Sequence, residues 1–192
     1  MSLILASNSE IRRAMLTQAG VEFTVSSPDF DEQKAKVGYG RGSKGLARVL
    51  AEGKALSIDT AEDWAIGSDS VVEVDGQRYS KPRDRDEAAR HLAAFSGRTM
   101  FLSSAVAVAH GGKIDWSHSE TARLYVRPLS EAFIRSYLDD EWPAVGYCVG
   151  VFRMEGRGVT LFEKVEGSHF TILGMPLLPL LVALRERGLI AS

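Results

Sequence analysis

The stretch from residue 66 to residue 82, IGSDSVVEVDGQRYSKP, most constrains what this chain can fold into. Valines lead into the dipeptide Asp75-Gly76, which favours a two-residue hairpin turn because both positions tolerate a positive φ. The segment therefore predicts a strand, a tight turn and an antiparallel return. Because strands and helices alternate irregularly around this hairpin, we expect a mixed sheet in an α/β fold.

Opposite charges flank the predicted hairpin. Asp69 precedes the turn, and Lys81 follows it in an extended conformation imposed by Pro82. A carboxylate beside an ammonium group suits phosphate chemistry, because the carboxylate can hold a metal or orient water while the ammonium neutralises phosphate oxygens. Taken alone, however, the pair is better explained as a surface hairpin with incidental charges.

The start of the chain predicts a second place for an anion. An apolar run, Leu3 to Ala6, indicates a buried strand, and Ser7 followed by Glu10 matches the capping box of a helix. Backbone N-H groups at a helix start attract anions, and Arg12 and Arg13 add positive charge there. A solvated pair of arginines is the commoner explanation of such a pattern.

Capping residues, turns and apolar periodicity predict the remaining elements. Residues 31–43 are charged and rich in glycine, which indicates a loop, and Ser43 is the expected N-cap of a helix that carries Lys54 near its apolar face. The other expected elements are a strand at 21–27, a helix from Asp84 to Phe95, a long hairpin over 101–126, a helix at 130–138, a loop at 141–150, a strand at 159–162 and a last helix from Pro176.

Composition narrows the class of protein. The 192 residues, 45% hydrophobic and 25% charged, are typical of a globular protein, which we expect to form one domain over residues 1–192. A net charge of -2 argues against a nucleic-acid-coating protein, and the single Cys148 excludes an internal disulfide framework. The longest apolar stretch, 172–184, is too short to span a membrane, and no signal peptide is visible, so the cytoplasm is the expected compartment.

Five segments in register resemble the Maf family of nucleoside triphosphate pyrophosphatases: LASNSEIRR, IGSDSVV, SKP, FSGR and EGRGVTLFEKVEGSHFTILGMPL. The resemblance implies a Maf/ITPase-like fold, with two lobes around a central mixed sheet and a cleft between them. It also implies hydrolysis of a nucleoside triphosphate to the monophosphate and pyrophosphate, supported by Mg²⁺ or Mn²⁺, including clearance of non-standard or methylated nucleotides. A homodimer is expected from the family alone.

The resemblance also carries roles for individual residues. Asp69 matches the family's catalytic proton acceptor, and Glu32 with Asp69 would hold the metal. A carboxylate near a metal can deprotonate the water that attacks the α-phosphorus, so this implied role agrees with the chemistry of the residues. The positions that match the family's substrate-binding residues are Ser7, Ser9, Arg12, Lys54 and Lys81.

Base specificity is implied at Ile11, Ser70 and Glu155. The thymidine and uridine triphosphate branch of the family shows Arg, Thr and Gln there, whereas the branch resembling 7-methyl-GTP pyrophosphatase shows an aromatic residue, Gln and Glu. Glu155 agrees with the second branch, while Ile11 and Ser70 agree with neither. The chain is thus most similar to the 7-methyl-GTP branch, and the preferred base stays open.

Two other functions are compatible with the pattern. One is a nucleotide-binding regulator of cell division or septum formation that needs no catalysis. Against it, a pure binder has no need of the base and metal carboxylates predicted at Asp69 and Glu32. The other is a phosphatase that removes one phosphate at a time, which the identity of the products would distinguish.

Overall fold

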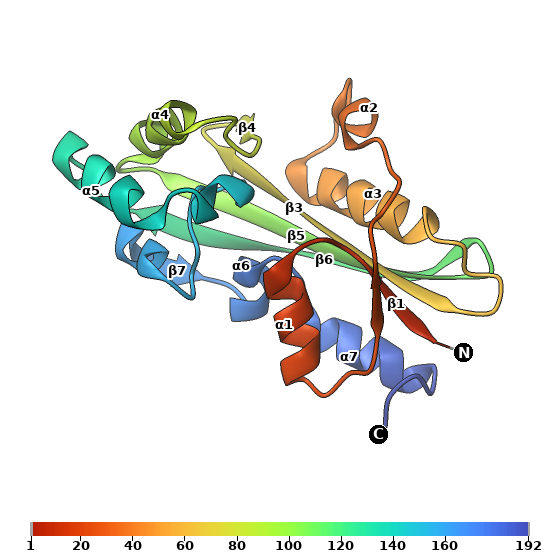
Figure 1. The fold of residues 1–192 in the computed structure, drawn as a ribbon. Helices are drawn as coiled ribbons and strands as arrows, with labels where there is room; N and C mark the ends of the chain where they lie inside the picture. Colours follow the sequence, from red (N-terminus) through yellow and green to blue (C-terminus); the bar gives the residue numbers. More distant parts are fainter. Residues whose placement is uncertain (1, 192) are drawn as a thin grey trace. The chain divides into compact units, whose positions relative to one another are not determined.

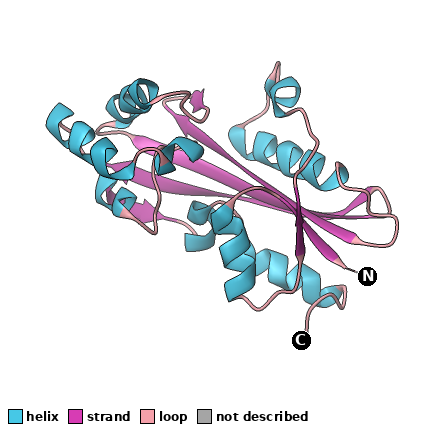
Figure 2. Ribbon diagram, viewed as in Figure 1, coloured by secondary structure: helices cyan, strands magenta, loops and turns pink. Residues whose placement is uncertain are grey.

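The structure is a computed structural model that describes residues 2–191 (Figures 1 and 2). Its sheet has the strand order β2-β1-β3-β5-β6-β7, and β4 pairs with β3. β1 runs parallel to β2 and β3, whereas the β3/β4 and β6/β7 pairs are antiparallel. The predicted mixed α/β sheet is therefore confirmed. The strands are β1 Leu3–Ala6, β2 Thr24–Ser26, β3 Trp64–Val74, β4 Gln77–Tyr79, β5 Thr99–His110, β6 Lys113–Val126 and β7 Phe162–Glu166.

Helices occupy most of the segments between the strands (Figure 1). The α-helices are α1 Glu10–Gln18, α2 Glu32–Lys36, α3 Ser43–Leu56, α4 Arg85–Phe95, α5 Glu131–Glu141, α6 His169–Leu173 and α7 Leu177–Glu186, and two 3₁₀ helices are η1 Ala144–Tyr147 and η2 Arg157–Leu161. Among the described residues, no helix is both long and apolar enough to cross a membrane.

The chain divides into two compact units. The first unit contains the chain up to Ser70, then Ser103–Glu120, and the chain from Ser168 onward. Its core is apolar because β1 and β3 present leucine and isoleucine side chains to the apolar faces of α1 and α7. The buried members of this core include Leu5, Leu16, Ile66, Val106, Leu180 and Leu184.

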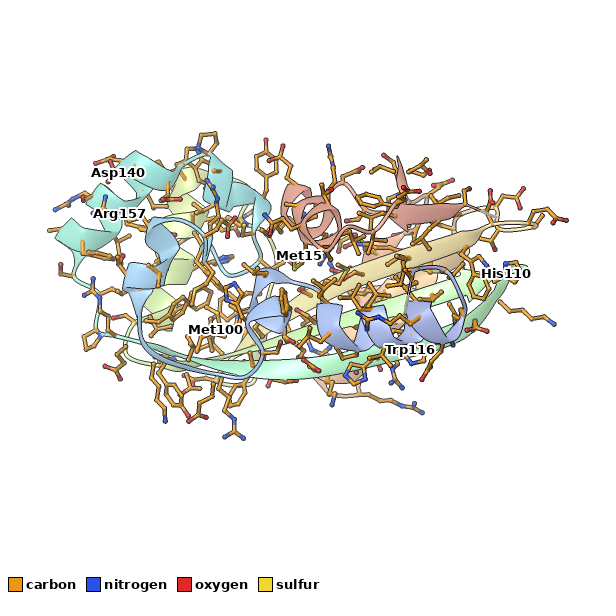
Figure 3. The ribbon with its side chains drawn as sticks, turned by 90° about the horizontal axis from the view of Figure 1, so that it is seen from below. Met15, Met100, His110, Trp116, Asp140 and Arg157 are labelled. Atoms are coloured by element: carbon orange, nitrogen blue, oxygen red, sulfur yellow. The ribbon has the colours of Figure 1, made fainter. Side chains whose placement is uncertain are left out.

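The second unit contains Val71–Leu102 and Thr121–Gly167. Helices α4 and α5 pack against each other there, and Phe95, Leu124, Tyr137 and Leu161 are buried. Arg157 of η2 also contacts Asp140 of α5 at the surface of this unit (Figure 3).

Several local predictions are confirmed. Asp75 and Gly76 both have a positive φ, as the predicted hairpin turn between β3 and β4 requires. The Asp84 carboxylate accepts a hydrogen bond from the backbone N-H of Glu87 and caps α4. Signals that depend on the backbone of a few consecutive residues were thus sufficient for these elements.

The prediction that Ser7 and Glu10 form the capping box of the first helix is wrong. Ser9, not Ser7, is the N-cap of α1, and its side chain makes no capping hydrogen bond. The Ser7 hydroxyl instead accepts a hydrogen bond from the backbone N-H of Ser9 at 3.2 Å, because the chain makes a further turn before the helix begins. Similarly, Gly42 rather than Ser43 is the N-cap of α3.

Two further predictions failed where side chains stabilise short helices. The expected loop at 31–43 contains α2, whose first turn is closed by the Asp31 carboxylate accepting from Lys34 N at 2.9 Å. The strand expected at 159–162 is largely η2, where the Thr160 hydroxyl donates to the Arg157 carbonyl, and β7 starts only at Phe162. Such local side-chain bonds compete with the ladder of a sheet.

Candidate active site

Lys54 joins two carboxylates in the first unit. Its ammonium lies 2.8 Å from Glu32 Oε1 and 2.9 Å from Asp69 Oδ2. Lys54 and Asp69 are 8% and 9% exposed, so neither charge is well solvated. Because an isolated buried charge is costly, each of these groups needs its partner, and the three side chains form one ionic cluster.

Close packing on α3 builds this cluster. A Cβ on Gly67 would lie 2.1 Å from the Ala51 carbonyl oxygen, so only glycine lets β3 lie directly against the helix backbone. On another side of α3, a Cβ on Gly53 would lie 2.3 Å from the ring of Phe30. Because Gly67 and Gly53 have no side chains, β3 and Phe30 lie close to α3. Asp69, two residues after Gly67, and Glu32, two residues after Phe30, therefore reach Lys54.

The charges of this cluster shift the titration of Glu32. Burial of the Glu32 carboxyl would raise its pKa, but the hydrogen bond and charge of Lys54, together with those of Lys36 at 3.2 Å, outweigh burial and lower the pKa to about 2. Glu32 is therefore ionised throughout the neutral range, as a metal ligand or a partner of Lys54 must be.

The two oxygens of Asp69 have different surroundings. Oδ1 accepts a hydrogen bond from the backbone N-H of Ser70 at 2.7 Å. Oδ2 is buried and, among the described residues, has no hydrogen bond of acceptable angle, although the Lys54 ammonium lies 2.9 Å away. A buried carboxylate oxygen with incomplete hydrogen bonding is a suitable acceptor for a water proton or ligand for a hard cation.

Arg12 is the centre of a second cluster in the same unit. It projects from the first turn of α1 and is buried, whereas Arg13 is exposed. Its Nε donates to the Gly174 carbonyl at 3.0 Å, and its guanidinium also donates to Ser70 Oγ at 3.2 Å and to Ser7 Oγ at 3.5 Å. These three acceptors are uncharged, and together they fix the orientation of the guanidinium.

Both clusters lie where β1 ends. The parallel pairing of β1 with β3 runs to Ala6 opposite Gly67, so Ser7 follows the end of β1 while Asp69 and Ser70 follow the last residue of β3 that pairs with β1. Successive residues of a strand project to opposite faces. Accordingly, Asp69 contacts Lys54 and Ser70 contacts Arg12. The carboxyl ends of parallel strands are the usual place for ligands in α/β sheets.

The remaining predicted residues of the first unit flank these clusters. Ser9 and Ile11 are both half-buried at the start of α1, next to Arg12 in the chain. The structure thus brings together six of the predicted residues in two contacting groups and places Ser9 and Ile11 beside them. The six are Ser7, Arg12, Glu32, Lys54, Asp69 and Ser70. Lys36, which was not predicted, is a second cation on Glu32.

Lys81 and Glu155 belong to the second unit, where both lie within electrostatic reach of one thiol. Burial raises the pKa of Cys148, the Glu155 carboxylate raises it further, and the Lys81 ammonium lowers it. The Glu155 carboxylate also lies 3.5 Å from Arg153 Nε. These two predicted residues are therefore neighbours within their own unit, around Cys148.

Comparison with known proteins identifies the family of the chain. A model of the Maf family, described as Maf-like protein, matches residues 2–187. The chain belongs to the Maf family. Maf proteins that are 41% identical to it include the 7-methyl-GTP pyrophosphatase of Rhizobium meliloti (strain 1021), over 98% of this chain and 97% of the relative. Another is the nucleoside triphosphate pyrophosphatase of Nitrobacter winogradskyi, also 41% identical, over 98% of this chain and 95% of the relative.

One solved structure, the nucleoside-triphosphatase (dITP/XTP pyrophosphatase) of Mycobacterium abscessus, aligns with a TM-score of 0.41 at 16% identity. It covers 66% of this chain and 74% of that protein. This likeness is too weak to add to the assignment, which rests on the family match and the full-length relatives.

The Maf chain also uses residues that the sequence did not single out. The Gly174 carbonyl accepts hydrogen bonds from Arg12, Ser68 and Ser70, and Ser104 links Ser70 to the carbonyl of Thr171. The only sequence signal was the family resemblance: Ser68 lies in the segment IGSDSVV, and Thr171 and Gly174 lie in the last segment, whereas Ser104 lies in none. A backbone carbonyl has no residue-type signature, so only the fold reveals this role.

Proposed function

We propose that this Maf protein hydrolyses nucleoside triphosphates to the monophosphate and pyrophosphate. The observation that carries the proposal is the ionic cluster of Lys54 with the carboxylates of Glu32 and Asp69, which lies next to the buried Arg12 site along β3. Relatives of the same length at 41% identity are named as pyrophosphatases of this kind, which supports the same reaction here.

The Arg12 cluster is suited to hold the phosphates. Its guanidinium is a permanent cation whose planar fork matches phosphate oxygens, and it is oriented in advance by Ser7, Ser70 and Gly174. The backbone N-H groups at the start of α1 and the hydroxyl of Ser9 add uncharged donors. We assign a further phosphate contact to Lys81 of the second unit.

Asp69 is suited to act as the general base. A water held by its Oδ2 would give up a proton as it attacks the α-phosphorus, and pyrophosphate would leave. Lys54 keeps the Asp69 carboxylate in position through the 2.9 Å ion pair, and the Ser70 N-H fixes the other oxygen. The cations around the phosphates stabilise the negative charge that develops on the departing pyrophosphate.

Glu32 and Asp69 are the residues that would hold Mg²⁺ or Mn²⁺. No group of three or more metal-ligating side chains occurs among residues 2–191, but Mg²⁺ is often held by one or two carboxylates together with substrate phosphates, so this pair fits the ion. Such a cation would supply charge neutralisation on the phosphate oxygens.

We propose that Ile11 and Glu155 contribute to the choice of base, with a methylated or other non-standard nucleotide as the proposed preference. A Glu155 carboxylate can accept hydrogen bonds from the N-H groups of a guanine-like edge. The relative named 7-methyl-GTP pyrophosphatase supports this preference.

Family membership also leads us to propose that the protein is cytoplasmic and forms a homodimer. Light scattering of the purified protein would test the homodimer.

The deciding experiment offers purified protein common and methylated nucleoside triphosphates with Mg²⁺ or Mn²⁺ and separates pyrophosphate from orthophosphate. We expect pyrophosphate, with a preference among the bases. Asp69→Asn should lose at least about a hundredfold in kcat while keeping its fold and nucleotide binding, because the amide cannot accept the water proton. Release of orthophosphate would replace the proposal with a phosphatase, and binding without turnover would favour a regulatory protein.

A further inference from the structure

The hydroxyl of Ser70 has three polar neighbours in the first unit. Arg12 Nη2 donates to it at 3.2 Å, Ser104 Oγ lies 2.9 Å away, and the Gly174 carbonyl oxygen lies 3.2 Å away. Ser104 is fully buried and lies 2.8 Å from the carbonyl oxygen of Thr171, to which it donates. Ser70 therefore connects the arginine to the interior of the unit.

The number of hydroxyl protons sets the direction of the hydrogen bonds around Ser70. Ser104 has one hydroxyl proton, and the Thr171 carbonyl, which cannot donate, takes it. Ser70 must then donate its own proton to Ser104 or to the Gly174 carbonyl, and it accepts from Arg12. Its proton is committed, so Ser70 has no donor left for a nucleotide base.

The Gly174 carbonyl supports the same arrangement. It accepts from Arg12 Nε at 3.0 Å, and the fully buried Ser68 hydroxyl, which also lies 2.8 Å from the Ala105 carbonyl, is 3.1 Å away. Gly174 has φ +109, and a Cβ there would lie 3.4 Å from Ser70 Oγ and 3.6 Å from Arg12 Nη2. The guanidinium is thus held on two edges, by a carbonyl and by a hydroxyl.

We propose that Ser70 is a positioning residue that fixes the Arg12 guanidinium for phosphate binding, and that it does not read the base. This proposal rests on the proposed function, because it assigns Arg12 to the phosphates. It differs from the family expectation that position 70 selects the base. The consequence is that loss of the Ser70 hydroxyl weakens the binding of every nucleoside triphosphate by a similar factor.

The test compares Ser70→Thr with Ser70→Val, two side chains of nearly the same shape that differ in the hydroxyl. We expect Ser70→Val to lower kcat/KM by roughly tenfold or more relative to Ser70→Thr, the effect of one lost hydrogen bond to a charged group. The factor should be the same for every base within about twofold. In contrast, Glu155→Gln should change the ratio between bases. A base-dependent loss in Ser70→Val would overturn the proposal.

A second readout needs no turnover and no base. Calorimetry should show that inorganic tripolyphosphate binds Ser70→Val about tenfold more weakly than Ser70→Thr, because Nη2 of the Arg12 guanidinium loses the Ser70 hydroxyl as its acceptor. Thr60→Val is the control and should bind like the wild type, because it removes another buried hydroxyl of the first unit, one that accepts from the backbone N-H of Gly112 at 3.1 Å. Equal affinities of the Thr and Val variants would refute the positioning role.

These outcomes separate the two proposals. If the wild type cleaves no nucleotide but the Thr and Val variants still differ in tripolyphosphate affinity, the pyrophosphatase function fails and the positioning role stands. If the wild type cleaves nucleotides and the two variants have equal kcat/KM and equal affinity, the function stands and the positioning role fails.

Discussion

At the scale of single residues, Lys54 is the group on which the candidate site depends most. It is 8% exposed and pairs with two carboxylates, so it neutralises charges that would otherwise repel each other in a poorly solvated place. Removing one partner of a buried ion pair is strongly destabilising, on the order of 3 to 5 kcal/mol, because it leaves the other charge uncompensated. The same lysine sets the ionisation of Glu32.

The Glu32 titration gives a test of this arrangement. Its pKa of about 2 lies below the ordinary 4.5, so the ionised carboxylate stabilises the fold above about pH 4.5, and this stabilisation is lost as the pH falls toward 2. In Lys54→Met the burial that raises the pKa remains while the main opposing cation is gone, so the pKa of Glu32 should rise above 2. NMR titration of the side-chain carboxyl carbon measures this shift.

Lys36→Met is the matched control for that titration. Lys36 also pairs with Glu32, at 3.2 Å, but it contributes less to the lowered pKa than Lys54 does. Its loss should therefore raise the pKa of Glu32 by less than the loss of Lys54. A larger shift in Lys36→Met than in Lys54→Met would contradict the cluster described here.

At the scale of elements, the contact between β3 and α3 positions the carboxylate of Asp69. The strand lies so close to the helix that a Cβ on Gly67 would lie 2.1 Å from the Ala51 carbonyl and 2.5 Å from Ala55 N. Both are backbone atoms, which cannot rotate away as a side chain can. The distance between Asp69 and Lys54 therefore depends on the absence of a side chain two residues earlier in the strand.

Gly67→Ala should separate these elements. Overpacking of this kind costs on the order of 1 to 3 kcal/mol, and the lower free energy of unfolding can be measured by urea denaturation. Gly40→Ala is the control, because a Cβ at Gly40 meets nothing within 4 Å. Equal stability of the two variants would mean that β3 and α3 are not held at this contact.

At the scale of the whole molecule, ligand binding should be visible as stability. A nucleotide that binds only the folded state stabilises it by mass action, by about 2.7 kcal/mol at a ligand concentration one hundred times Kd. The family match over residues 2–187 includes the predicted ligand-binding residues of both compact units. The melting temperature of the full chain is therefore a suitable measure of nucleotide binding.

We expect a nucleoside triphosphate analogue with a methylene bridge between the α and β phosphates to raise Tm in the presence of Mg²⁺. Removal of the metal with EDTA should reduce the shift. In Glu32→Gln the shift should no longer respond to EDTA, because the variant lacks one of the two proposed metal ligands. A shift in the wild type that is insensitive to EDTA would remove the metal from the proposed function.

The sequence by itself determined what depends on short stretches of backbone. The Asp75-Gly76 turn follows from two residues that tolerate a positive φ. The cap at Asp84 follows from a carboxylate placed three residues before Glu87, whose backbone N-H donates to it. The family followed from segments whose order is preserved along the chain. These signals are local or sequential, so they need no knowledge of the fold.

Only the tertiary structure decided which groups meet. Arg12 and Gly174 are separated by 162 positions, and Ser70 and Ser104 by 34, yet they share hydrogen bonds. No local pattern encodes such contacts, because they arise when α1, β3, β5 and the end of α6 pack on one core. The same packing turned Ser7 from an expected helix cap into a partner of Arg12 and placed Lys54 between Glu32 and Asp69.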